Sequence, residues 1–277
     1  MSELVSIHGG HSGQFCNHAE DSLEKIIQTY IAKGFQWAGI TEHMPPLKDS
    51  FLYPEEKKAG LNAAGMQDRF DEYIKTTRWL QQKYSSFITI YLGVETEFYS
   101  NVVPFIEKLR KKFQPDFLVG SVHHVADIPF DYSPGLYAKA LAAAGSIEAL
   151  YCSYFDLQYE MLKSLRPAVV GHFDLIRIYD DEYHRRWQVP EIINRIKRNL
   201  DFIRECDLIL DFNLRAFQKG DKEPYISKPI LLLARDLGIK IVPGDDSHGK
   251  NQVGLNISRA IKILKAIGVT DKWPRPV

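Results

Sequence analysis

Short apolar runs rich in branched and aromatic residues recur along the chain, and segments with helical periodicity follow them. Seven runs have the length and composition of strands that are buried on both faces of a parallel sheet. Because strand and helix alternate, the sequence predicts β/α units with parallel strand pairing. The predicted strands are Leu4–Ile7, Trp37–Thr41, Ile88–Val94, Phe117–Val122, Ala168–Val170, Leu208–Phe212 and Lys240–Val242.

The segments between these runs carry helix signals of their own. An apolar stripe with i, i+3 and i+4 spacing predicts a helix over residues 23–31, with a capping-box-like start at Asp21 and a stop at Gly34. The longest helical stretch, 137–165, is interrupted at Gly145, and we therefore expect two helices there.

Candidate ligands follow six of the seven predicted strands, and their positions favour one architecture. In a closed barrel all strand ends meet at one mouth, whereas an open doubly wound sheet spreads them along an edge. We therefore expect a barrel-like relative of the eightfold β/α fold, with the open sheet as the competing architecture. The 277 residues suit a single domain over residues 1–277, because barrels commonly exceed about 200 residues as one unit.

Composition indicates the class of protein but says little about any reaction that it catalyses. The chain is 45% hydrophobic and 25% charged, as ordinary globular enzymes are. Its 35 basic and 35 acidic residues balance, so no overall field favours nucleic acid or an anionic membrane. An anionic small molecule must then be attracted by a local site. The sequence leaves the oligomeric state open.

Cysteine usage and the amino terminus indicate a compartment. Cys16, Cys152 and Cys206 are odd in number and form no CxxC pair, which suits a reducing environment. The start MSELVSIH lacks the basic and apolar segments of a signal peptide, and no run approaches about 18 apolar residues. We expect a cytoplasmic protein without disulfides or membrane spans.

Nine residues able to bind metal lie at or near the ends of the predicted strands, and they include seven of the nine histidines. A neutral imidazole offers a lone pair, and a carboxylate adds the negative charge that lets several cations lie close together. The pattern predicts a metal-dependent hydrolase. The nine are His8, His11, His18, His43, Glu95, His123, His172, Asp246 and His248.

Two carboxylates in this set have neighbours that offer the same chemistry. Glu97 follows Glu95 by two residues and so lies on the same strand face, but it is further from the apolar run. Asp245 precedes Asp246 and is a similar alternative.

Two other residues need a choice of role. Strand alternation points consecutive side chains to opposite faces, so only one of His123 and His124 is expected to face the mouth. Cys16 lies in the first strand-to-helix loop, and we expect it to pack as a small apolar side chain, with zinc binding as the alternative.

In chain order, the histidine cluster near the amino terminus, TEHMP, GVE, SVHH, GHFDLIR and DDSH resemble the PHP (polymerase and histidinol phosphatase) superfamily, specifically its histidinol-phosphate phosphatases. The resemblance covers nearly the whole chain. It implies the PHP fold, a distorted (β/α)7 TIM-like barrel, with three divalent metal ions, zinc being expected and iron or manganese the alternatives. The implied ligands are His8, His11, Glu95 and Asp246 for the first metal, Glu95, His123 and His172 for the second, and His18, His43 and His248 for the third.

One spacing departs from the family pattern. The family usually opens with H-x-H, whereas His8 and His11 are separated by Gly9 and Gly10. A glycine-supported bulge would return both imidazoles to one metal.

The resemblance also implies a phosphate site. Arg177 in GHFDLIR and Arg215 in DFNLRAF match arginines that the family carries after its fifth and sixth strands. A guanidinium is planar and permanently charged, and it grips phosphate oxygens with two parallel hydrogen bonds. Ser247, between two predicted ligands, is expected either to donate a hydrogen bond to the substrate or to cap the following turn.

The activity implied by the resemblance is hydrolysis of L-histidinol phosphate to L-histidinol and phosphate, a late step of histidine biosynthesis. Asp246 and His248 are the candidates for protonating the leaving group. Two alternatives stay open. One is a PHP phosphoesterase acting on nucleotides, and the other is a non-catalytic PHP-like metal-binding module.

Overall fold

Seven parallel strands form one sheet in the computed structural model, which describes residues 3–277. Residues 1 and 2 lie outside the described residues. They begin the segment MSELVSIH, in which the sequence predicts no signal peptide. The strand order is β1-β2-β3-β4-β7-β8-β9, and every neighbouring pair is parallel. All seven predicted strands are therefore confirmed. Their bounds are β1 Val5–Ser6, β2 Trp37–Ile40, β3 Thr89–Glu97, β4 Phe117–Ser121, β7 Val169–Val170, β8 Ile209–Asn213 and β9 Lys240–Gly244.

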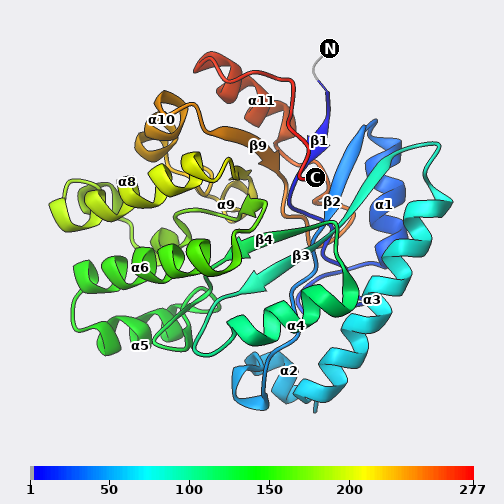
Figure 1. The fold of residues 1–277 in the computed structure, drawn as a ribbon, viewed down its shortest axis with the longest axis horizontal. Coiled ribbons are helices and arrows are strands. Elements are labelled where there is room, and N and C mark those ends of the chain that lie inside the picture. The colour runs from blue at the N-terminus through cyan, green and yellow to red at the C-terminus, as the bar shows by residue number, and fades with distance from the viewer. Residues whose placement is uncertain (1–2) are drawn as a thin grey trace.

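Hydrogen bonds between the two ends of the sheet close it into a barrel. The backbone N–H of Ile7 donates to the carbonyl of Pro243 at 2.9 Å, and that of Asp246 donates to the carbonyl of His8 at 2.8 Å. The first strand therefore lies beside the last, and the strands occupy the centre of the molecule with helices around them (Figure 1). This is the distorted (β/α)7 barrel that the sequence predicts, and the open sheet is excluded.

Eleven α-helices are described in residues 3–277, together with two 3-10 helices and a short antiparallel hairpin after β4. The hairpin consists of β5 (His124–Val125) and β6 (Ile128–Pro129), and the 3-10 helices are η1 (Asp49–Phe51) and η2 (Leu175–Tyr179). The α-helices are α1 Leu23–Ala32, α2 Pro54–Lys58, α3 Ala63–Lys83, α4 Val103–Phe113, α5 Pro134–Ala144, α6 Ile147–Leu165, α7 Tyr183–Arg186, α8 Pro190–Glu205, α9 Arg215–Gln218, α10 Lys228–Asp236 and α11 Ile257–Ala266.

The helix boundaries differ from the sequence pattern at the start of two helices: α5 begins at Pro134 rather than at residue 137, and the cap of α1 is shifted. The break at Gly145 separates α5 from α6 as predicted, and Gly145 has a φ of +88° that suits glycine. The cap of α1 is Ser22, whose side chain accepts a hydrogen bond from the N–H of Lys25. Asp21 instead accepts a hydrogen bond from the N–H of Lys250, so the predicted start at Asp21 is wrong by one residue.

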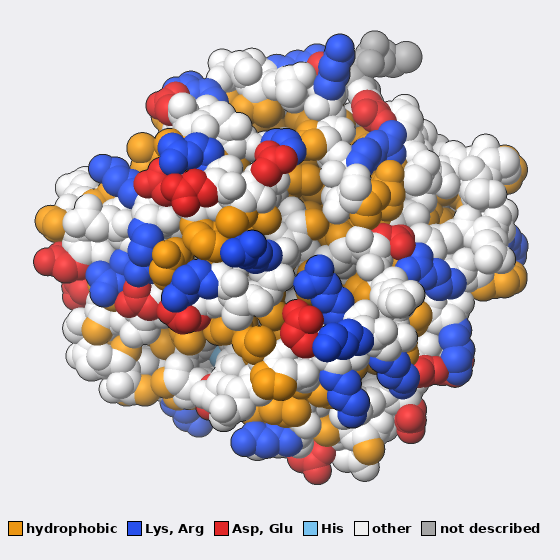
Figure 2. Space-filling view, in the orientation of Figure 1, with side chains coloured by type: hydrophobic (Ala, Val, Ile, Leu, Met, Phe, Trp, Pro, Cys, Tyr) orange, Lys and Arg blue, Asp and Glu red, His pale blue; other side chains and the backbone are white. Residues whose placement is uncertain are grey.

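The surface carries no large field of one sign on the face in Figure 2, where basic and acidic side chains are interspersed. That distribution agrees with the balance of 35 basic and 35 acidic residues. Within residues 3–277, no helix is both long enough and apolar enough to cross a membrane.

Tyr73 on α3 joins two strands that lead into the barrel mouth. Its buried hydroxyl lies 2.8 Å from the carbonyl oxygen of Ile40 at the end of β2 and 2.6 Å from that of Gly93 in β3. The single proton is shared between the two carbonyls. Because both are buried, their loss of this partner leaves polar atoms unsatisfied.

We predict that Tyr73→Phe lowers the free energy of unfolding by about 1–3 kcal/mol, because removing one partner exposes the desolvation cost of the others. Urea unfolding measures this difference. Tyr84→Phe, which removes a hydroxyl that bonds near the surface, serves as the control and should cost no more than about 0.5 kcal/mol. Equal stability of Tyr73→Phe and the parent protein would contradict the inferred role.

Candidate metal centre and active site

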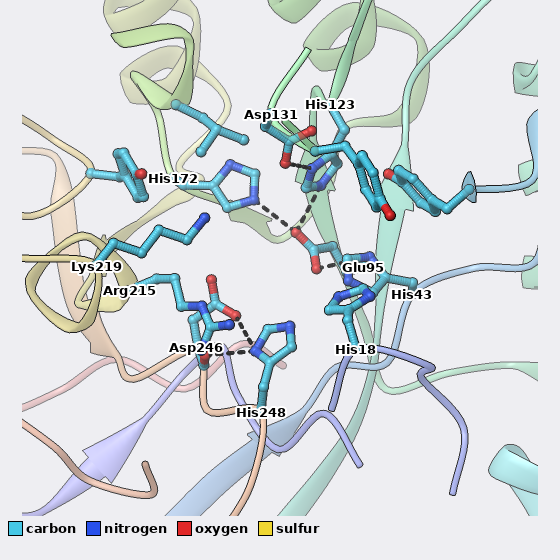
Figure 3. A pocket seen from close by; sticks show the side chains of 14 residues that line it. His18, His43, Glu95, His123, Asp131, His172, Arg215, Lys219, Asp246 and His248 are labelled. Atoms are coloured by element: carbon cyan, nitrogen blue, oxygen red, sulfur yellow. Dashed lines mark hydrogen bonds and ion pairs between the residues drawn. The ribbon is translucent and has the colours of Figure 1, made fainter. Parts of the chain in front are cut away.

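An open pocket of about 210 Å³ lies at the carboxyl ends of the barrel strands. Residues that are distant in sequence meet there, as parallel strands closed into a barrel require. Seven of the nine predicted ligands line it, and the imidazoles surround the Glu95 carboxylate in Figure 3. The lining residues are His18, His43, Tyr53, Glu95, His123, Asp131, Tyr132, His172, Leu175, Arg215, Lys219, Tyr225, Asp246 and His248.

Glu95 is the centre of the cluster, and each of its oxygens faces a different group of imidazoles. Oε1 lies 3.2 Å from Nε2 of His123 and 2.8 Å from Nε2 of His172. Oε2 lies 3.3 Å from Nε2 of His8, 3.7 Å from Nε2 of His11 and 3.3 Å from Nδ1 of His43. A carboxylate in this position is able to bridge two cations.

The backbone fixes Glu95 within β3 itself, one residue beyond the predicted end of that strand. Its N–H donates to the carbonyl of Glu42 at 3.0 Å, and its carbonyl accepts from the N–H of Met44 at 2.9 Å. The segment after β2 therefore continues to pair with β3 at the mouth. This pairing places His43 directly beside Glu95.

The two glycines between His8 and His11 allow both imidazoles to reach one carboxylate oxygen. Gly10 has a φ of +76°, in the region that favours glycine. A Cβ on Gly9 would come within 2.5 Å of the Tyr30 hydroxyl, so this position has no room for a side chain. His11 Nε2 also lies 3.5 Å from Oδ1 of Asp246. The bulged spacing thus brings His8, His11, Glu95 and Asp246 together.

Oxygen atoms hold the outer nitrogens of several imidazoles and leave the inner nitrogens facing the cluster. His8 Nδ1 lies 2.8 Å from Oδ2 of Asp211, and His123 Nδ1 lies 3.0 Å from Oδ2 of Asp131. A carboxylate that holds the outer nitrogen fixes the tautomer and ring orientation of a metal-binding histidine. Sequence reasoning missed both residues, although Asp211 occupies the one predicted strand that carried no candidate ligand.

A third group of candidate ligands is formed by three imidazoles and one thiol. His18, His43 and His248 have ring centroids 5.0–6.4 Å apart, and the Cys16 thiol lies 3.3 Å from Nε2 of His18. Ligand atoms of these four residues all fall within 4.8 Å of one another. Burial, reinforced by the charge of Glu42, raises the pKa of the Cys16 thiol.

The charges in the cluster compensate one another. Burial alone would raise the pKa of Glu95, but His8, His43 and the hydrogen bonds from His123 and His172 hold it well below its ordinary value. Glu97, the alternative to Glu95, lacks that surrounding. Burial raises the pKa of Glu97 to about 8, and its nearest imidazole nitrogen is His43 Nδ1 at 3.4 Å.

The donor set fits divalent metal ions. Nε2 of His8 and both ring nitrogens of His11 are buried and have no hydrogen-bond partner among the described residues. A buried nitrogen of this kind costs free energy unless it has a partner, and a metal ion is a partner for a lone pair. The groups of neighbouring donor atoms overlap the sets expected from the sequence: His8, His11 and Asp246 lie together, as do Glu95, His123 and His172, and His18, His43 and His248 are joined by Cys16. Glu95, which is also expected in the first set, groups on that side with His11 and His43. Their roles as ligands stay a prediction.

Asp246 and His172 have unusual backbone conformations. Their φ angles are +46° and +21°, in a region that residues with side chains rarely adopt. Backbone strain of this kind costs on the order of 1–3 kcal/mol and is concentrated at functional sites. It indicates that the barrel mouth holds these two side chains against a local preference.

Two positively charged side chains reach the pocket from the segment after β8. Arg215 begins α9, and its guanidinium is positioned by the side-chain oxygens of Gln218 and Gln252 at 3.2 and 2.5 Å. Lys219 lies one helical turn later, and its ammonium points into the pocket in Figure 3. The sequence analysis missed Lys219, although the spacing of four residues from Arg215 places both on one face of a short helix.

Arg177 lies outside the pocket, contrary to the expectation that it grips phosphate. It is buried, and its guanidinium donates to Asp221 Oδ2 at 3.2 Å and to the carbonyls of Glu223 and Pro224 at 3.1 and 2.8 Å. These partners engage both terminal nitrogens of the guanidinium, and its Nε lies 3.5 Å from Oδ2 of Asp174. Arg177 therefore anchors the loop that leads to Tyr225, a residue of the pocket wall.

Ser247 is also turned away from the pocket. Its hydroxyl accepts a hydrogen bond from the N–H of Gly10 at 3.2 Å and lies 3.1 Å from the Tyr30 hydroxyl. It ties the last loop to the first one, so the expected contact with substrate is not supported. His124 faces away as predicted, beside Phe51 and Tyr99, while His123 faces the pocket.

Comparison with known proteins identifies the family. The model of the PHP domain matches residues 9–215. The chain belongs to the PHP domain family. It is 40% identical to "Probable histidinol-phosphatase" of Schizosaccharomyces pombe over 96% of this chain and 88% of that protein. It is 28% identical to histidinol-phosphatase of Saccharomyces cerevisiae over 93% of this chain and 87% of that protein.

A solved structure has the same fold. Histidinol phosphate phosphatase from Lactococcus lactis subsp. lactis, in complex with zinc, L-histidinol and phosphate, superposes with a TM-score of 0.72. It covers 96% of this chain and 94% of its own length at 21% identity. This likeness supports the barrel of the PHP domain described here.

We predict that Glu95→Gln causes this PHP domain to lose bound metal and activity together, because the amide lacks the charge that lets two cations approach. Elemental analysis of purified protein measures the metal content. Glu97→Gln is the matched control, since Glu97 faces one imidazole rather than five. If Glu95→Gln retained its metal while Glu97→Gln lost it, Glu97 would be the bridging residue.

Proposed function

We propose that this protein is a histidinol-phosphatase, which hydrolyses L-histidinol phosphate to L-histidinol and phosphate in histidine biosynthesis. The observation that carries this proposal is one pocket, lined by seven of the nine candidate metal ligands and backed by the other two, His8 and His11, with Arg215 and Lys219 beside them. The substrate follows from the relatives, which bear the name histidinol-phosphatase and match over most of the chain. The three unpaired cysteines favour the cytoplasm as its compartment.

We assign three divalent ions to the pocket, with zinc as the expected metal. His8, His11, Glu95 and Asp246 would hold the first ion. Glu95 would share the second with His123 and His172, while His18, His43 and His248 would hold the third. When bound, such ions polarise a phosphoryl oxygen and activate water at neutral pH.

The protein's own cations bind the phosphate. Arg215 and Lys219 lie on the same side of the pocket, close to Asp246 and His172 (Figure 3). A phosphomonoester dianion entering a protein of no net charge needs such a local attraction. In the transition state, the fixed guanidinium stabilises charge on the phosphoryl oxygens without having to reorganise.

The opposite wall of the pocket accommodates the organic part of the substrate. Oδ2 of Asp131 lies 3.0 Å from Nδ1 of His123. The other oxygen, Oδ1, is buried and has no hydrogen-bond partner among the described residues. That oxygen is a suitable acceptor for the substrate ammonium group. Tyr53 and Tyr132 stack on each other beside it, with ring centroids 5.7 Å apart, and offer faces for the imidazole.

Protonation of the leaving alkoxide is assigned to the side of the pocket that carries Asp246 and His248. Nδ1 of His248 lies 3.0 Å from the carbonyl oxygen of Asp246, to which its N–H donates. Burial lowers the pKa of His248 well below its ordinary value, reinforced by the neighbouring positive groups. At neutral pH the ring is therefore neutral, and with its N–H held by the carbonyl it offers Nε2 as a lone pair for metal. A water molecule held between Asp246 and His248 would then deliver the proton to the alkoxide.

The test is turnover of a panel of phosphomonoesters by protein of measured metal content. Histidinol phosphate is expected to be hydrolysed faster than nucleoside monophosphates, sugar phosphates and phosphoserine. Removal of metal with a chelator should abolish phosphate release, and zinc should restore it. Preference for a nucleotide would replace this proposal with the nucleotide-directed PHP phosphoesterase, and a fully metallated protein with no turnover would favour a non-catalytic module.

We predict that Arg215→Ala lowers kcat/KM for histidinol phosphate on the order of ten- to a hundredfold, because a charge-assisted contact to phosphate commonly contributes about 1.5–3 kcal/mol. Metal content should stay unchanged. Arg215→Lys should recover only part of the loss, since a point charge cannot reproduce the bidentate fork. Near-normal efficiency of Arg215→Ala would remove Arg215 from the phosphate site.

A further inference from the structure

Cys16 faces the third group of ligands from the side opposite the open pocket. His18 and His43 line both the open pocket and a smaller pocket behind it. His248 lines only the open pocket, and Cys16 lines only the smaller one. The centre of the group therefore lies between the two pockets, with the thiol as its rear wall.

The distances around the thiol match those of a tetrahedral metal site. With bonds of about 2.3 Å to sulfur and about 2.0–2.1 Å to nitrogen, two ligand atoms at a tetrahedral zinc lie roughly 3.5 Å apart. The Sγ atom of Cys16 lies 3.3 Å from Nε2 of His18. The atoms that Cys16, His18, His43 and His248 offer lie within 4.8 Å of one another, so small side-chain rotations complete the set.

The outer nitrogens of two of these imidazoles are engaged elsewhere. His18 Nδ1 lies 3.5 Å from Oε1 of Glu55, and His248 Nδ1 donates to the carbonyl of Asp246 at 3.0 Å. Each ring therefore presents Nε2 as the free lone pair. Holding the outer nitrogen in this way is typical of histidines that bind metal.

Backbone and side-chain hydrogen bonds hold the loop that carries the thiol. The N–H of Cys16 donates to the carbonyl of Ser12 at 2.8 Å. The N–H and hydroxyl of Ser12 both donate to Oε1 of Glu42, at 2.7 Å each. Because Glu42 precedes His43, the thiol and that imidazole are fixed by the same contacts.

We propose that Cys16 is the fourth ligand of the third metal ion, and that the resulting site of one thiolate and three imidazoles is closed and selective for zinc. This inference rests on the proposed trinuclear centre. On binding, the thiol would lose its proton to solvent and form one sulfur–metal bond. Four protein ligands leave no open position, as in structural zinc sites, and a thiolate favours zinc over manganese. Hydrolysis would then depend on the two ions that share Glu95.

Zinc X-ray absorption of the wild-type holoprotein tests the ligand without any substitution. We expect about one sulfur neighbour per three zinc ions, at about 2.3 Å. A protein with three bound zinc ions and only nitrogen and oxygen neighbours overturns the proposal, as does a protein that binds only two ions. These outcomes are independent of whether histidinol phosphate is turned over.

Cobalt-substituted protein provides the second measurement. Wild-type protein is expected to show a thiolate-to-cobalt charge-transfer band in the near ultraviolet, and Cys16→Ser should lack it. Cys152→Ser is the matched control and should keep the band, because Cys152 lies on α6, away from the third ligand group. Persistence of the band in Cys16→Ser assigns the sulfur to another residue and overturns the proposal.

Metal affinity distinguishes a ligand from a packing residue. In Cys16→Ala, competition with a chelator should show one zinc bound at least tenfold more weakly, while the other two are unchanged. A packing role predicts lower stability with all three affinities intact. That result would return Cys16 to the apolar role and leave the proposed phosphatase activity standing.

Discussion

The burial of the Glu95 carboxylate is the interaction on which the rest of the mouth depends. An unpaired charge at this depth would be strongly destabilising, because the protein interior cannot replace water around it. Five imidazoles compensate it, and they come from β1 and its loop, the segment after β2, and the ends of β4 and β7. The charge is therefore tolerated because the ends of these neighbouring strands meet at the mouth.

The closure of the barrel and the glycines of the first loop together bring His8, His11 and Asp246 close to one another. Hydrogen bonds join the start of the chain to its last strand, and they deliver Asp246 beside His8. Gly9 and Gly10 let the loop pass without side chains, so that the extra residue between the two histidines is absorbed. Gly10→Ala would strain the backbone at a positive φ, which explains why small residues stand here.

The chain has no net charge, and this makes the basic side chains beside the pocket necessary for binding an anion. With no net field to attract an anion, the two cations beside the pocket must supply the attraction locally. In the proposed phosphate site, Arg215 at the start of α9 and Lys219 at its end would do so, whereas Arg177 holds a loop in place. The same residue type thus has two roles, decided by which acceptors lie within reach of the guanidinium.

The sequence by itself determined the seven strands, the barrel and the set of candidate metal ligands, because these depend on periodicity and on residue chemistry. Buried parallel strands must be apolar, and a ligand must follow a strand end to reach the mouth. Tertiary structure alone decided which oxygen of Glu95 faces which imidazole, and that Asp211 and Asp131 hold His8 and His123. It also decided that Arg177 and Ser247 face other partners and that Lys219 faces the pocket. Such outcomes depend on distances between segments far apart in sequence, and local pattern does not encode those distances.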